Sequence, residues 1–106
     1  MRPYASLTRA ADFSRVRRNG RRIDGAALTI YRDRARHDDP ASLVGIAIGK
    51  AVGNAVVRNK IRRRLAAILD EALVGRTPMR LLIVAQPSAA QAPFPILREQ
   101  LVAGLA

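Results

Sequence analysis

The fold is decided by residues 54–74, which read NAVVRNKIRRRLAAILDEALV. Apolar side chains recur there every three or four residues and therefore share one stripe of a helix: Val57, Ile61, Leu65, Ile68 and Ala72. Asn54 belongs to a residue type that caps helix N-termini, and Gly75 is typical of the position after a helix. We therefore predict one amphipathic helix from Asn54 to about Val74.

Apolar segments on either side of this helix predict the sheet that it covers. Residues 43–48 place larger apolar side chains on one face, whereas Gly45 and Ala47 leave the opposite face thin. Residues 79–85 form the most apolar predicted strand, and its continuous apolar run at residues 81–85 is typical of a central strand covered on both faces. The alternating segment 26–32 predicts a third strand.

Two further helices are expected near the ends of the chain. Residues 7–19 carry apolar side chains at a helical spacing and stop at Asn19-Gly20, and residues 96–105 repeat leucine every four residues. Residues 1–6 are expected to be a loose start, and the sequence leaves open whether they are ordered. The order helix, strand, strand, helix, strand, helix predicts a single α/β domain over residues 1–106, a small two-layer sandwich around a mixed sheet.

The charge of the chain indicates a polyanionic partner. Its 106 residues include 19 Lys plus Arg and 8 Asp plus Glu, which gives a net charge of +11. All but Lys50 and Lys60 of these cations are Arg, whose planar group matches phosphate geometry. Many of the cations gather in residues 15–22 and 58–64, so they are interpreted as two parts of one footprint. Nucleic acid is the first expected partner and an anionic membrane surface the second.

Several classes of protein and of site are excluded by composition. The absence of cysteine excludes disulfides, thiolate zinc sites and thiol nucleophiles. No apolar stretch approaches the roughly 18 residues of a membrane-spanning helix. The only histidine, His37, lies in a charged turn, and no spacing typical of a metal site or a catalytic triad is present. The polypeptide alone is therefore not predicted to be a catalyst.

The basic part of the long helix favours binding over a merely solvated surface. Arg58 with Arg62 and Lys60 with Arg64 are like charges four residues apart, which destabilise an isolated helix. No acidic residue lies within reach before Asp70. We expect an external polyanion to supply the counter-charge, helped by the free N–H groups at the start of the helix.

These residues also carry a specific resemblance. Lys50, followed at residues 53–63 by Gly-Asn-Ala-Val-x-Arg-Asn-Lys-Ile-Arg-Arg, resembles the signature of the bacterial ribonuclease P protein component. The flanking elements agree in order, from Asp12-Phe13-x-x-Val16 and Gly20 to a strand ending at Tyr31 and the two later strands. The resemblance covers about residues 7–105.

The resemblance implies a fold and a function. The fold would be the same sandwich with a left-handed βαβ crossover around the basic helix. The function would be to bind a large catalytic RNA and the 5′ leader of precursor tRNA, and so to assist endonucleolytic removal of that leader. The RNA and its Mg²⁺ ions would perform the hydrolysis, with no metal or cofactor bound by the protein. The protein would act in the bacterial cytoplasm, without a membrane, as a monomer in a 1:1 complex.

The resemblance also assigns residues, with two departures. Contact with the catalytic RNA falls to one set of matched positions: Lys50, Asn54, Arg58, Asn59, Lys60, Arg62 and Arg63. Leader binding falls to the aromatic positions Phe13 and Tyr31. Arg17 stands where the family often has another aromatic residue, so leader recognition is expected to be more electrostatic. Ala66 stands where a cation is frequent, and Arg64 stays open as a contact because it lies nearer the apolar stripe.

The sequence leaves three other functions to consider. A ribosomal or other structural RNA-binding protein could use the same basic helix without any processing role. A helix-turn-helix DNA-binding protein would need two adjacent helices, whereas a strand is predicted between the helices here. A protein-only nuclease would need clustered carboxylates or histidines for its metal, which this sequence lacks.

Overall fold

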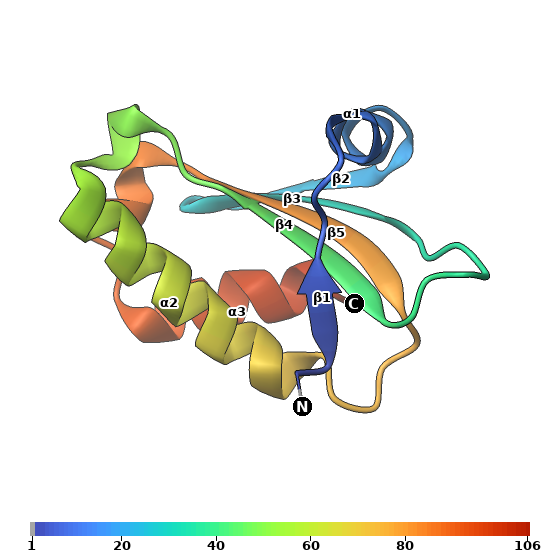
Figure 1. Cartoon of the computed structure of the whole chain (residues 1–106). Coiled ribbons are helices and arrows are strands. Elements are labelled where there is room, and N and C mark those ends of the chain that lie inside the picture. Colours follow the sequence, from blue (N-terminus) through green and yellow to red (C-terminus); the bar gives the residue numbers. More distant parts are fainter. Residues whose placement is uncertain (1) are drawn as a thin grey trace.

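The computed structural model describes residues 2–106 and forms a five-stranded mixed sheet with helices on both faces (Figure 1). The strands lie in the order β1-β4-β5-β3-β2. Their bounds are Tyr4–Ser6 for β1, Arg21–Asp24 for β2, Leu28–Arg34 for β3, Ser42–Ala47 for β4 and Met79–Ala85 for β5. The helices are α1 at Ala10–Asn19, α2 at Ala55–Ala72 and α3 at Phe94–Gly104, with short 3-10 turns η1 at Lys50–Val52 and η2 at Pro87–Ala90.

The centre of the sheet is β5, as the apolar run predicted. It pairs in parallel with β4 and antiparallel with β3. Because α2 connects β4 to β5, these three elements form a parallel βαβ unit. The α/β class and the mixed sheet are thereby confirmed, whereas the left-handed sense of the crossover stays a prediction.

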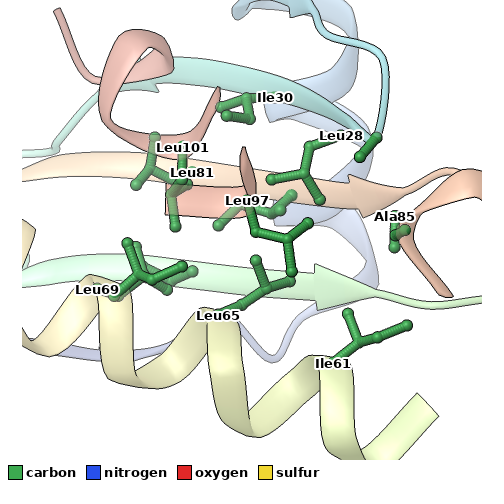
Figure 2. Close-up of a cluster of buried hydrophobic side chains, with 14 of the residues drawn as sticks. Leu28, Ile30, Ile61, Leu65, Leu69, Leu81, Ala85, Leu97 and Leu101 are labelled. Atoms are coloured by element: carbon green, nitrogen blue, oxygen red, sulfur yellow. The ribbon is translucent and has the colours of Figure 1, made fainter. Parts of the chain in front are cut away.

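The main hydrophobic core lies between the sheet and the pair α2 and α3. Figure 2 shows that α2 and α3 point leucine and isoleucine side chains at those of β3 and β5. The predicted helix stripe is in place, with Ile61, Leu65 and Ile68 buried. The Asn54 side chain accepts a hydrogen bond of 3.0 Å from the Val57 N–H, so the predicted cap is confirmed.

Helix α1 lies on the opposite face of the sheet, where a second and smaller core forms (Figure 1). Its fully buried members are Leu7, Val16 and Leu82. The expected two-layer sandwich therefore accounts for the sheet with α2 and α3, and α1 adds a partial third layer. The reason is that β5 turns Leu82 and Val84 to this face, which needs its own cover.

The expectation of a loose start at residues 1–6 is wrong for the described part of that segment. Strand β1 pairs in parallel with β4 through Tyr4, Ala5 and Ser6, and Tyr4 is buried. Residue 1 lies outside the described residues. A three-residue strand carries no periodic signal of its own, because its pairing with β4 specifies it.

Strand β2 was also missed, because its sequence Arg-Arg-Ile-Asp is almost entirely polar. It is an edge strand, and charged side chains are common there because they discourage pairing with other chains.

Candidate nucleic-acid interface

The polar side of α2 presents the predicted cationic residues to solvent. Lys60, Arg62 and Arg63 are exposed together with Asn59, whose Oδ1 accepts a 3.2 Å hydrogen bond from Arg62 Nη1. Arg58 is half-buried, and its Nε has no hydrogen-bond partner among residues 2–106. Arg64 is also half-buried, in agreement with its expected position nearer the apolar stripe.

The positive charge of this surface is not neutralised within the described chain. The ion pairs found in residues 2–106 involve other arginines, namely Arg2, Arg22, Arg80 and Arg98. Asp70, the first acid after the cluster, lies 3.5 Å from Arg2. The self-repulsion anticipated from the sequence is thus present in the fold.

The start of α2 is open to a large partner. Lys50 on η1 and Asn54 are exposed, and both precede the first helical turn. Val56 is 74% exposed, so an apolar side chain stands among polar ones without protein cover. Val56 lies outside the predicted apolar stripe, which was the available signal of its exposure. The N–H groups of this turn and Val56 offer a partner both polar and apolar contacts.

On the other face of the sheet, Phe13 of α1 rests directly on β4. A Cβ atom added to Gly45 would overlap the Phe13 ring, so only glycine leaves room for this ring. The thin face predicted for β4 is therefore the face on which α1 packs. Phe13 is half-buried, with one part in the small core and the rest accessible.

A hollow of about 270 Å³ joins the two predicted groups of site residues. Phe13, Gly45 and Ile46 line one side of it, and Arg62 and Ala66 of α2 line the other. We call this space the β4 hollow. Tyr4 and Arg2 of the N-terminal segment also line it, and sequence analysis missed them because that segment was expected to be loose.

Tyr31, the second predicted aromatic residue, lies beside two arginines. The guanidinium carbons of Arg17 and Arg22 are each 5.7 Å from the centroid of its ring, within cation–π range. Arg22 is the cross-strand partner of Tyr31 on β2, so it follows from a strand that the sequence did not reveal. Phe13, Arg17 and Tyr31 are therefore brought to one face, and Tyr31 supports Arg17 in addition to packing in the small core.

A buried ionic cluster fixes α1 and the turn after β3 to the central strand. Arg80 of β5 is only 6% exposed. Its Nε and Nη2 donate to the two carboxylate oxygens of Asp39 at 2.9 and 2.8 Å, and its Nη1 donates to Asp12 Oδ1 at 3.2 Å. Asp12 immediately precedes Phe13, so this Arg80 cluster holds the N-terminal end of α1 against the sheet.

The Arg80 cluster shifts the acid–base behaviour of its members. The hydrogen bonds from Arg80 lower the pKa of Asp39 from 3.8 to about 2, although desolvation opposes the shift. The same hydrogen bonds raise the pKa of Arg80. The sequence analysis missed this cluster, yet an arginine inside the apolar run 79–85 is a signal that a carboxylate must lie nearby.

Replacing Arg80→Met should lower the free energy of unfolding by about 3–5 kcal/mol, because it leaves two poorly solvated carboxylates without their partner. The matched control is Arg98→Met, which breaks the exposed ion pair between Arg98 and Glu71 and should cost less than about 1 kcal/mol. Urea unfolding at neutral pH measures both. If both variants lost the same free energy of unfolding, the conclusion that the Arg80 cluster stabilises the fold more than a surface ion pair would be wrong.

Asp39 should make stability sensitive to acid in a defined window. Its pKa is about 2 in the folded state against an ordinary 3.8, so folding favours the ionised form. The stabilisation is fully present above pH 3.8 and is lost as the pH falls through about 2. The stability difference between wild type and Asp39→Asn should therefore shrink across that window in urea unfolding. The same change at the exposed neighbour Asp38 serves as control, and a difference independent of pH would refute the assignment.

Comparisons with known proteins agree on one family. The chain matches the family Ribonuclease P over residues 1–106. The ribonuclease P protein component of Acidothermus cellulolyticus is 42% identical over 89 residues, covering 83% of this chain and 74% of the relative. That of Rhodococcus opacus is 40% identical over 106 residues, covering 93% and 84%.

Solved structures show the same fold. The RNase P protein of Staphylococcus aureus superposes with a TM-score of 0.84 at 23% identity, covering 94% of this chain and 91% of the other. That of Thermotoga maritima gives 0.77 at 19% identity, covering 92% of both chains. From the family match and the curated relatives, the chain belongs to the ribonuclease P protein components, the protein subunits of a ribonucleoprotein endonuclease.

Proposed function

We propose that this subunit binds two RNA elements at once, the catalytic RNA along α2 and the single-stranded 5′ leader of precursor tRNA over the α1 face. One observation carries the proposal: Arg62 of the cationic helix and Phe13 of the aromatic face line the same β4 hollow. A single-stranded RNA leader lying in that hollow would therefore run beside an RNA bound to α2.

The α2 surface supplies the contacts for the catalytic RNA. Its unpaired cations would exchange mutual repulsion for phosphate contacts and release counter-ions from the RNA. Arg58, Lys60, Arg62 and Arg63 would bind phosphates, while Asn59 orients Arg62 through their hydrogen bond. Lys50 and Asn54 would extend this contact to the approach of the helix, where main-chain N–H groups favour an anion.

The α1 face supplies the contacts for the leader. Phe13 offers an accessible aromatic surface, and stacking on such a surface tolerates any base. Arg17, held over Tyr31, would bind a leader phosphate or stack on a base. Arg22 beside the same ring adds a second cation, so this part of the leader site is more electrostatic than aromatic.

Hydrolysis is assigned to the catalytic RNA and its Mg²⁺ ions. Most carboxylates of the described chain already bind arginine: Asp12, Asp24, Asp39, Asp70 and Glu71. Within residues 2–106, no group of three or more His, Cys, Asp or Glu side chains is arranged to hold a metal ion. The protein would therefore act by binding and positioning RNA.

The cellular location and the stoichiometry of the complex are also part of the proposal. The protein would work in the cytoplasm, one copy per catalytic RNA. No helix within residues 2–106 has the length and apolar character needed to cross a membrane.

Reconstitution with a bacterial catalytic RNA tests the function directly. At a low Mg²⁺ concentration, the protein should increase cleavage of precursor tRNA at the 5′ end of the mature tRNA, because its proposed contacts with the leader would hold the substrate on the catalytic RNA. The measurement is the single-turnover cleavage rate with and without the protein. An unchanged rate, with the protein shown to be folded, would reject the proposal.

Arg62→Ala should weaken binding of the catalytic RNA and reduce its salt dependence. Each lost phosphate contact lowers the slope of log K against log salt by roughly 0.7–0.9. The control is Arg98→Ala, which removes the same charge from α3 and should leave the slope unchanged. Filter binding over a series of salt concentrations measures both, and an unaltered slope for Arg62→Ala would remove this residue from the interface.

Gly45→Ala should impair leader binding specifically. The new methyl group would displace the Phe13 ring, so precursor tRNA with a long leader should bind the holoenzyme about tenfold more weakly, within the 1–3 kcal/mol range of base stacking. Gly49→Ala is the matched control, because its Cβ meets no atom within 4 Å. Affinity for mature tRNA should not change. Equal affinities of the Gly45 and Gly49 variants for the long-leader substrate would contradict the assignment.

A further inference from the structure

A second cationic hollow, of about 510 Å³, lies on the sheet face that carries α2 and α3. Arg21, Arg32 and Arg34 line it, and Thr77, Pro78 and Met79 form its other wall. Arg32 donates a hydrogen bond to the main-chain oxygen of Ala106 after α3, which places the hollow beside the end of that helix. We call it the Arg21 hollow, and it is separate from the β4 hollow.

Strand alternation creates this second site. Arg22 faces Tyr31 on the α1 side, so its neighbour Arg21 on β2 must point to the other side. There Arg21 is the direct cross-strand partner of Arg32. The cationic segment 15–22, interpreted from the sequence as part of one footprint, is therefore divided between the two faces of the sheet.

Two of the three cations of the Arg21 hollow, Arg21 and Arg34, have no acidic partner among residues 2–106. Like charges directly opposite on neighbouring strands destabilise a sheet, and Arg21 and Arg32 are such a pair. Arg34 adds a third cation two residues further along the same face of β3. In the part of the chain that the structure describes, none of these three arginines lies within 4.0 Å of an Asp or Glu carboxylate, and only Arg32 has a protein partner, the oxygen of Ala106. Asp33, which also lines the hollow, accepts a hydrogen bond from the Arg34 main-chain N–H.

We propose that the Arg21 hollow is a third RNA-binding site, which takes phosphates of an RNA backbone. Arginine forks suit phosphate oxygens, and Pro78 and Met79 offer apolar surface to the sugars. Among residues 2–106, no aromatic side chain lines it, so it suits an RNA backbone better than stacked bases. The proposal rests on the proposed function, because both the catalytic RNA and precursor tRNA present such a backbone.

The test compares two double variants with the same loss of charge. Arg21→Gln with Arg34→Gln removes two cations from the hollow and leaves Arg32 in its contact with Ala106. Arg36→Gln with Arg98→Gln is the control, since neither residue lines the Arg21 hollow. Salt-dependent binding is measured in two arms, the protein with the catalytic RNA and the holoenzyme with precursor tRNA.

The hollow variant should show a slope of log K against log salt that is smaller by about 1.5, corresponding to two lost phosphate contacts. The arm in which the slope falls identifies the RNA that occupies the site. Slopes equal to the control in both arms would overturn the proposal. If wild type binds both RNAs in those titrations, this failure leaves the proposed function intact, whereas a wild type that binds neither rejects the proposed function.

A third double variant separates charge from folding. Arg21→Lys with Arg34→Lys keeps both cations and should retain the wild-type slope, because a counter-ion release effect follows charge. A lysine variant that loses as much slope as the glutamine variant would overturn the proposal as well, since the effect would then come from altered structure.

Discussion

The structure depends on a single constraint: the central strand β5 carries apolar side chains on both of its faces, and each face must be covered by other elements. Leu81 and Ile83 face α2 and α3, and Leu82 and Val84 face α1. The apolar cluster on the α1 face is small, and two further features hold α1 against the sheet there. Gly45 on β4 makes room for the Phe13 ring, and Arg80 on β5 holds Asp12 and Asp39. Without these features, α1 would have only a few apolar contacts to keep it on the sheet.

The same constraint explains how the protein can present the two proposed RNA-binding surfaces on so small a body. Because α1 and α2 cover opposite faces of one sheet, an aromatic surface and a cationic helix end up on different layers (Figure 1). They come together at the β4 edge, where β1 is short and the β4 hollow is lined by both Phe13 and Arg62. Arg62 of the cationic helix and Arg2 of the N-terminal segment both line this hollow.

The sequence allowed most of the fold and a good part of the candidate site to be predicted, for reasons that are local. Helix α2 is predicted from its apolar stripe and its Asn54 cap, and β5 is predicted from its apolar run. Arg62 and Phe13 were placed on the right elements by those patterns and by the family resemblance. What could not be predicted depends on distant partners. Strand β1 exists only by pairing with β4, and Arg80 finds Asp39 and Asp12 at sequence separations of 41 and 68. The position of Arg22 beside Tyr31, and the division of the arginine segment between two faces, follow from the unpredicted strand β2.

The central claim is that one subunit binds two different RNA elements through surfaces on opposite sides of the same sheet, one at α1 and one at α2. Site-specific photo-cross-linking tests it most directly, with a photoreactive amino acid at Arg17 of α1 and, in a separate variant, at Arg63 of α2. Each variant is assembled with the catalytic RNA and a labelled precursor tRNA, and the cross-linked nucleotides are mapped. The account predicts cross-links from Arg17 to nucleotides of the 5′ leader and from Arg63 to the catalytic RNA. Cross-links from both positions to the same RNA element would contradict it.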